Sequence, residues 1–145
     1  MYFVDRKKIE ETLKYMDGLL QELGKQSFES FRDKLLLERV TQMVIESILD
    51  VGNMMIDGFI MRDPGSYEDI IDILVDEKVL PSEQQEGYKA VVKLRTMIVK
   101  EYLDIDHRKV LTTLNENKQA LGSFSKRIHT YLENELGVAN AFSNE

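Results

Sequence analysis

Apolar residues recur along most of the chain at spacings of three and four positions, which is the period of an α-helix with one buried face. Two long segments show this pattern first, residues 5–23 and about 28–61. The stripe of the first consists of Ile9, Leu13, Met16, Leu20 and Leu23, and we expect Asp5 to cap its start and Gly24 to end it. The second segment is apolar over much of its circumference, so we predict a helix that is central or shared between two subunits.

Three further segments show the same helical period. They are a short one between Ser66 and Pro81, one that opens at Ser82 and includes residues 88–105, and one from Asp104 or Asp106 to Leu136, where Gly137 is the expected stop. The turn dipeptide Pro64-Gly65 separates the second helix from the short one. No segment has the period of two that indicates a strand. We therefore predict an all-α fold, an up-down bundle of four main helices and one short helix in a single domain over residues 1–145.

Composition excludes several classes of protein. The 145 residues include no cysteine, so disulfides and thiolate metal sites are excluded, and two histidines are too few for a histidine-rich site. A net charge of −7 argues against broad electrostatic attachment to nucleic acid or to an anionic membrane. No apolar run reaches the roughly 18 residues of a membrane span, and the first residues do not resemble a signal peptide. We expect a cytoplasmic protein with no membrane partner.

Arg95 lies in the middle of an apolar helix face. That face carries Tyr88, Val91, Val92, Ile98, Val99 and Tyr102. A buried arginine needs a partner, and a polar line on the second long helix can supply one: Arg39, Gln42, Glu46, Asp50, Asn53 and Asp57. This line is either a solvated strip or a set of acceptors for Arg95. Arg95 itself is either a structural arginine paired with Asp50 or Glu46, or a phosphate ligand.

The common catalytic signatures are missing from the sequence. It contains no Gly-rich phosphate loop, no G-x-S-x-G and no H-E-x-x-H. A di-metal bundle would need Glu-x-x-His motifs, which are also missing, so we predict no metal and no cofactor. Taken alone, Tyr102 is a core tyrosine or a catalytic group, and Lys100 is a surface lysine on the flank of the helix end. We expect His107 to be a residue at the start of the last helix.

The segment from Arg95 to Tyr102, RTMIVKEY, resembles the R-x4-H-x-Y motif of HepT-like proteins in the HEPN superfamily. The resemblance extends over at least residues 35–115, and it is closest to a branch found in Firmicutes. Its other elements are Glu38-Arg39, Gln42 and residues 48–53 in the second helix, residues 63–67 with Leu74 and Val79-Leu80, and residues 104–106 with Val110 and Leu114.

This resemblance implies a homodimer whose motif helices face each other across a cleft. Active members are toxins that cut RNA without a metal, and an MntA-like minimal nucleotidyltransferase antitoxin neutralises them by adding AMP to the motif tyrosine, here Tyr102. The motif arginine is Arg95. Asp50 and Asn53 correspond to residues that support the site, and Thr96 stands where the family often has asparagine.

Lys100 is the departure from the family motif, because it occupies the position of the histidine. Metal-free RNA cleavage needs a group that takes the 2′-hydroxyl proton and one that protonates the leaving oxygen. Histidine suits both roles near neutral pH, whereas a lysine with a pKa near 10.4 is a poor base. His107 would lie about 120° around a continuing helix from Arg95, although a loop could bring it near.

We therefore expect a homodimeric, basic cleft lined by Arg95, Lys100 and Tyr102. The protein would be a weak ribonuclease, or a lapsed relative that still binds RNA or nucleotide. In a third interpretation it is a structural dimer in which Arg95 only satisfies Asp50.

Overall fold

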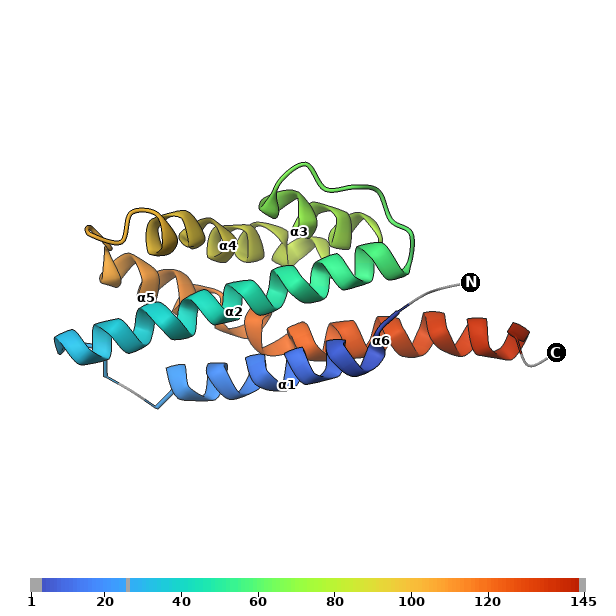
Figure 1. Cartoon of the computed structure of the whole chain (residues 1–145), viewed down its shortest axis with the longest axis horizontal. Helices are drawn as coiled ribbons and strands as arrows, with labels where there is room; N and C mark the ends of the chain where they lie inside the picture. The colour runs from blue at the N-terminus through green and yellow to red at the C-terminus, as the bar shows by residue number, and fades with distance from the viewer. Residues whose placement is uncertain (1–3, 26, 144–145) are drawn as a thin grey trace.

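The computed structural model describes residues 4–25 and 27–143, and over these residues the chain forms six α-helices and one 3-10 helix with no strand (Figure 1). The predicted all-α fold is confirmed. The elements are α1 (Arg6–Leu23), α2 (Phe31–Gly58), α3 (Tyr67–Asp76), η1 (Ser82–Gln84), α4 (Gln85–Val99), α5 (His107–Glu116) and α6 (Lys118–Ser143). No helix within the described ranges combines the length and apolarity that crossing a bilayer requires.

Polar side chains set the starts of the first two helices. The carboxylate of Asp5 accepts a hydrogen bond from the Lys8 amide at 3.0 Å, so α1 begins where the sequence predicted. The hydroxyl of Ser30 accepts from the Asp33 amide at 3.1 Å, and α2 therefore begins at Phe31 rather than at the expected Phe28. Each cap satisfies one of the amides that a helix start leaves without an intrahelical partner.

Helix α2 is the central element of the subunit. It packs against α1, α3, α4 and α5, and Figure 1 shows it between α1 and α6 on one side and α3 and α4 on the other. Its apolar side chains contribute to the core from much of its circumference, and they include Leu37, Val44, Ile45, Ile48, Leu49, Val51, Met55 and Ile56. The broad apolar surface of this helix is thus used within one chain, by helices on several sides.

Gly52 lets α3 lie directly on α2. A Cβ atom at this position would lie 2.5 Å from the Cγ2 atom of Ile70, closer than real Cβ atoms approach a neighbour. The start of α3 is capped by the Ser66 hydroxyl, which accepts from the Asp69 amide at 3.1 Å. Together the close contact and the cap fix the position of Tyr67, the first residue of α3.

The prediction that one helix includes residues 88–105 is wrong, because α4 ends at Val99. The carbonyl of Thr96 accepts from the amides of both Lys100 (2.9 Å) and Glu101 (3.2 Å), which widens the last turn. Beyond it Tyr102 and Leu103 are exposed. A further helical turn would therefore have had no apolar contact to hold it on the bundle. The S-x-x-Q segment at Ser82 likewise forms η1, and α4 begins only after it.

The predicted last helix is two helices, α5 and α6, separated at Asn117. The Asn117 side chain donates to the carbonyl of Thr113 at 2.9 Å, and such a bond competes with the backbone ladder of a helix. The break also lets α4 come close, since a Cβ atom on Gly87 would lie 2.3 Å from the Asn117 Oδ1 atom. The expected stop at Gly137 is wrong, because α6 continues to Ser143.

Tyr88 joins α4 to α6 inside the core. Its ring is fully buried and its hydroxyl donates to the carbonyl of Ala120. Burial raises the pKa of this phenol to about 12. The residue that opens the apolar face of α4 is therefore structural, as a buried tyrosine with a bonded hydroxyl usually is.

Two non-glycine residues end helices in the left-handed conformation. Ile60 has φ 55° and Lys78 has φ 62°. In each case the next amide reaches back over the helix end, from Met61 to the Ile56 carbonyl at 2.9 Å and from Val79 to the Leu74 carbonyl at 2.8 Å. These are Schellman endings, in which glycine is the usual residue because a side chain makes the left-handed conformation costly.

Candidate functional site

Arg95 is held from two sides. Its Nε atom donates to the Oε1 atom of Glu46 on α2 at 2.6 Å, and its guanidinium carbon lies 4.6 Å from the centroid of the Tyr67 ring. The hydrogen bond that Arg95 donates to Glu46 is the largest cause that raises the pKa of Arg95 above its ordinary value. We call these three residues the Arg95 site. Two fixed contacts on a planar group determine both its position and its plane.

The two terminal nitrogens of Arg95 remain available. In the part of the chain that the structure describes, neither Nη atom has a hydrogen-bond partner. About 23% of the Arg95 side chain is exposed, so these nitrogens can be reached from solvent. A guanidinium fork that is held through Nε offers its outer edge to two oxygens of one phosphate or carboxylate. Arg95 is thus paired with a carboxylate and still able to bind an anion.

The acidic line on α2 has divided roles. Glu46 is the partner of Arg95, one of the two carboxylates that the sequence offered. Asp50 is exposed and lines a shallow hollow of about 280 Å³ between α1 and α2, together with Lys8 and Tyr15. Partial burial and then the charge of Glu46 raise the pKa of Asp50, and the charge of Lys8 opposes that rise. Asp50 therefore lines a hollow with Lys8 of α1 and does not accept from Arg95.

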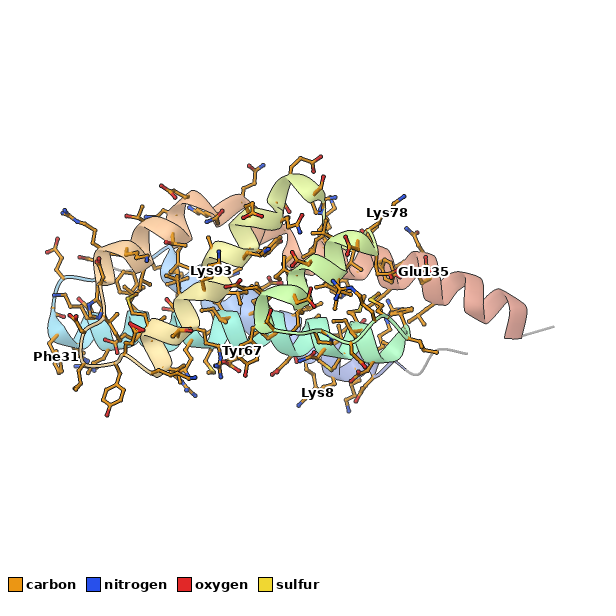
Figure 2. The ribbon with its side chains drawn as sticks, turned by 90° about the horizontal axis from the view of Figure 1, so that it is seen from above. Lys8, Phe31, Tyr67, Lys78, Lys93 and Glu135 are labelled. Carbon is orange, nitrogen blue, oxygen red and sulfur yellow. The ribbon has the colours of Figure 1, made fainter. Side chains whose placement is uncertain are left out.

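Tyr67 is the member of the site that sequence reasoning missed. Tyr67 is the first residue of α3. Figure 2 shows it near the middle of the molecule's length, whereas Phe31 lies at one end of α2. The loop before it is closed by Asp69, which accepts from both terminal nitrogens of Arg62 (2.7 and 2.8 Å) and from the Gly65 amide (2.8 Å). These bonds, the one from Arg62 first, lower the pKa of Asp69 to about 2. We call these three hydrogen bonds to Asp69 the clamp. The clamp fixes the loop that precedes Tyr67, whose ring contacts Arg95.

The other motif residues lie at the end of α4. Thr96 is exposed in its last turn, and Lys100 is the exposed residue that caps it. Tyr102 lies in the connection to α5 with 66% of its surface exposed. The expectation that Tyr102 shares the helical face of Arg95 is therefore wrong, because the helix ends before it. Asn53 is exposed on α2 and lines a cavity with Tyr67.

His107 does not replace the missing motif histidine beside Arg95. Residues 100–106 do connect α4 to α5 as a loop, but they place the His107 Nε2 atom 2.8 Å from the Glu38 Oε2 atom. Glu38 and Glu46 are eight positions apart on α2, about two turns and 12 Å along its axis. The His107–Glu38 pair is thus a second contact on the same helix. Within the described residues, no group of three or more histidine and acidic side chains is arranged to hold a metal ion.

Comparison with known proteins agrees with this architecture. Residues 9–128 match the family model described as Ribonuclease HepT-like. The chain is 47% identical over 143 residues to "Putative RNase YutE" of Bacillus subtilis (strain 168), covering 98% of this chain and 99% of that protein. The solved structure of the Bacillus subtilis cytosolic protein YutE superposes with a TM-score of 0.92 at 47% identity, over 94% of this chain and 96% of the other. The chain therefore belongs to the HepT-like ribonuclease family.

Proposed function

We propose that the protein binds RNA as a homodimer and cleaves it without a metal ion, slowly, as the toxin homologue of a toxin–antitoxin system. The family model and the name of the Bacillus subtilis relative both support a ribonuclease. That relative is described as cytosolic, and we assign this protein to the cytoplasm as well.

The observation that carries the proposal is the free outer edge of Arg95. Glu46 and Tyr67 fix the guanidinium while its terminal nitrogens stay unpaired among the described residues. Because these donors are open to solvent and the guanidinium is held through its other contacts, they can exchange water for the oxygens of a phosphate. A phosphate of the RNA backbone would accept two hydrogen bonds there and be positioned for attack by the neighbouring 2′-hydroxyl.

Lys100 explains why we propose slow cleavage. Attack of the 2′-oxygen on phosphorus forms a cyclic phosphate and breaks the bond to the 5′-oxygen, so one proton leaves the 2′-hydroxyl and one is delivered to the 5′-oxygen. A histidine at the motif position would perform such transfers near neutral pH. With Lys100 there instead, Arg95 can position and stabilise the phosphate while proton transfer stays poorly catalysed. Thr96, Asp50 and Asn53 are assigned supporting roles.

The exposed surface at the end of α4 supports two proposed partners, a second copy of this chain and an MntA-like nucleotidyltransferase. Leu103 is 91% exposed and Tyr102 is exposed beside it, so an apolar patch lies next to the motif residues. We assign Leu103 to the dimer contact that brings two copies of the site together, with Tyr102 left accessible at its edge. The accessible phenol of Tyr102 is also the proposed acceptor of AMP from an MntA-like nucleotidyltransferase. Mass spectrometry after incubation with such an enzyme and ATP should locate AMP on Tyr102, with Tyr15→Phe as a control that leaves the modification intact.

An RNA cleavage assay in the presence of EDTA tests the enzymatic proposal. We expect wild type to release products with a cyclic phosphate, Arg95→Ala to lose this activity, and Lys100→His to raise it at least tenfold, since general acid–base catalysis contributes about 10²–10⁴. Lys93→His is the matched control, because Lys93 is an exposed lysine of the same helix and should leave the rate unchanged.

A second candidate function is RNA or nucleotide binding without turnover, and the specific observation in its favour is Lys100 itself. Wild type that binds RNA but never cleaves it, with cleavage restored by Lys100→His, would replace the first proposal with this one. Absence of both binding and cleavage, with a lowered melting temperature for Arg95→Ala, would leave a structural dimer in which Arg95 serves only the fold.

A further inference from the structure

A shallow, open surface cavity of about 370 Å³ lies beside the Arg95 site, between α2 and the loop that leads into α3. The residues that line it are Asn53, Pro64, Gly65, Ser66, Tyr67 and Ile70. Tyr67 belongs to both sites, because its ring lies against the guanidinium of Arg95 and also forms part of the cavity wall. A ligand that fills the cavity would therefore be a direct neighbour of an anion bound to Arg95.

The walls of the cavity are neutral and in large part flat or apolar. None of the six lining side chains carries a charge. The ring of Tyr67, 52% exposed, and the pyrrolidine ring of Pro64 are stacking surfaces, and Gly65 leaves its backbone open to close approach. Ile70 is buried and forms an apolar floor. Such walls accept a planar, uncharged group and provide no counter-ion for a phosphate or a carboxylate.

Asn53 supplies the polar end of the cavity. It is exposed, and within the described part of the chain its side-chain amide has no hydrogen-bond partner. An amide presents one donor and one acceptor in the same plane, which is the pattern that pairs with N7 and the N6 amino group of adenine. The Ser66 hydroxyl oxygen already accepts from the Asp69 amide, so its proton remains to be donated.

The clamp on the loop keeps these walls in place without a ligand. Asp69 binds both terminal nitrogens of Arg62 and the Gly65 amide, and Gly52 seats α3 on α2. Preformed walls lower the entropy cost of binding a small group. The cavity is therefore a built feature of the α2–α3 junction.

We propose that this cavity is a nucleobase subsite with a preference for adenine, in which Tyr67 stacks on the base and Asn53 pairs with its edge. This inference rests on the proposed RNA binding, and it adds a base preference to the phosphate contact at Arg95. The base in the cavity and the phosphate on Arg95 belong to the same nucleotide or to adjacent ones, because Tyr67 touches both positions. Phosphate contacts position a nucleic acid, whereas contacts to base edges specify its sequence.

Calorimetric titration of the full chain with r(A)6, r(U)6 and r(C)6 tests the proposal. We expect r(A)6 to bind most tightly, Tyr67→Leu to weaken it about tenfold or more, and Tyr67→Phe to stay within twofold of wild type, since stacking needs the ring and not the hydroxyl. Asn53→Ala should remove the preference for r(A)6 over r(U)6. Phe31→Leu is the matched control, because Phe31 is an aromatic residue 78% exposed at the end of α2 away from the cavity (Figure 2), and it should change nothing.

The two proposals fail in different ways. Arg95→Ala should weaken all three oligonucleotides by a similar factor, since it removes a phosphate contact and no base contact. If it does so while Tyr67→Leu and Asn53→Ala leave both the affinities and the r(A)6 preference unchanged, the nucleobase subsite is refuted and the RNA-binding function stands. If wild type binds none of the oligonucleotides, both proposals are refuted. Melting temperatures of all variants guard against loss of folding, and the ratio of r(A)6 to r(U)6 affinity is a readout that a merely structural role would not move.

Discussion

Two glutamates on the same helix hold two different side chains, and their comparison separates a site from a structural contact. Glu46 binds Arg95 at 2.6 Å and Glu38 binds His107 at 2.8 Å. The Arg95 and His107 side chains are equally accessible, at 23% and 22%. Burial and distance therefore do not distinguish the two pairs. The two pairs differ in the hydrogen-bonding atoms that are left for a ligand once the pair has formed. The guanidinium of Arg95 keeps two terminal nitrogens and has an aromatic neighbour, whereas the imidazole of His107 keeps one ring nitrogen.

The largest effect is expected from a change that disturbs the Arg95 site through its support. Gly52→Ala would place a methyl group against Ile70, so we expect the free energy of unfolding to fall by about 2 kcal/mol, as overpacking of a close contact does. Urea unfolding measures this, with Gly18→Ala as a control because nothing lies within 4 Å of a Cβ atom there. RNA affinity should fall as well, since α3 carries Tyr67. Equal stability of the two variants would show that α3 is not seated as described.

The second prediction compares the two glutamates directly. Glu46→Ala frees the guanidinium of Arg95 from its Nε contact, so we expect RNA cleavage to fall about tenfold, equivalent to roughly 1.4 kcal/mol of lost transition-state stabilisation. Glu38→Ala should change the rate by less than about twofold, because the His107–Glu38 pair lies two turns away. Equal losses in both variants, measured under the same conditions, would mean that the two pairs form one functional unit.

The third prediction concerns stability at the other pair. His107→Asn removes the hydrogen bond between α5 and α2, and the expected cost is about 1 kcal/mol, typical of one such bond. Thermal unfolding measures the change, while RNA affinity should remain that of wild type. A loss of affinity without a loss of stability would assign His107 to the RNA site after all.

The smallest effect is expected just after the C-terminal end of α2, away from both the Glu46–Arg95 pair and the Glu38–His107 pair. Ile60→Gly relieves a left-handed residue whose side chain is 78% exposed, so little packing is lost. The gain should be about 0.5 kcal/mol, because the strain relieved is partly offset by the greater freedom of glycine in the unfolded chain. Lys78→Gly, at the equivalent position of α3, should give a similar gain in the same unfolding assay. Destabilisation by Ile60→Gly would indicate a contact for the Ile60 side chain.

The sequence predicted the parts of this molecule that depend on helical periodicity. Ile9, Leu13, Met16 and Val91 are buried as their spacing required, and Glu46 was one of two acceptors offered to Arg95. Periodicity also explains the main error, since Tyr102 continues the helical spacing of α4 although the chain there has left the bundle. Where a helix stops against solvent depends on tertiary contacts, and no glycine or proline marks the point.

Tyr67 could not have been found in the same way. Its contact with Arg95 requires the loop after α2 to be closed by Arg62 and Asp69, seven positions apart, and α3 to rest on Gly52. Each of these is a relation between elements rather than a pattern within one. The segment RDPGSY indicated a turn and a cap, but the direction in which the ring points follows only from the closed loop.

The clamp at Asp69 affects how the protein responds to acidic pH. A carboxylate whose pKa is lowered to about 2 in the folded state, from an ordinary value of 3.8, stabilises the fold fully above 3.8, loses that contribution gradually below it, and has lost it once the pH has fallen through about 2. On acidification, carboxylates with ordinary pKa values become neutral first. The loop that carries Tyr67 should therefore keep its native shape after the surface charges of the bundle have begun to titrate. In an acid titration followed by NMR, the Gly65 amide should be among the last signals to move.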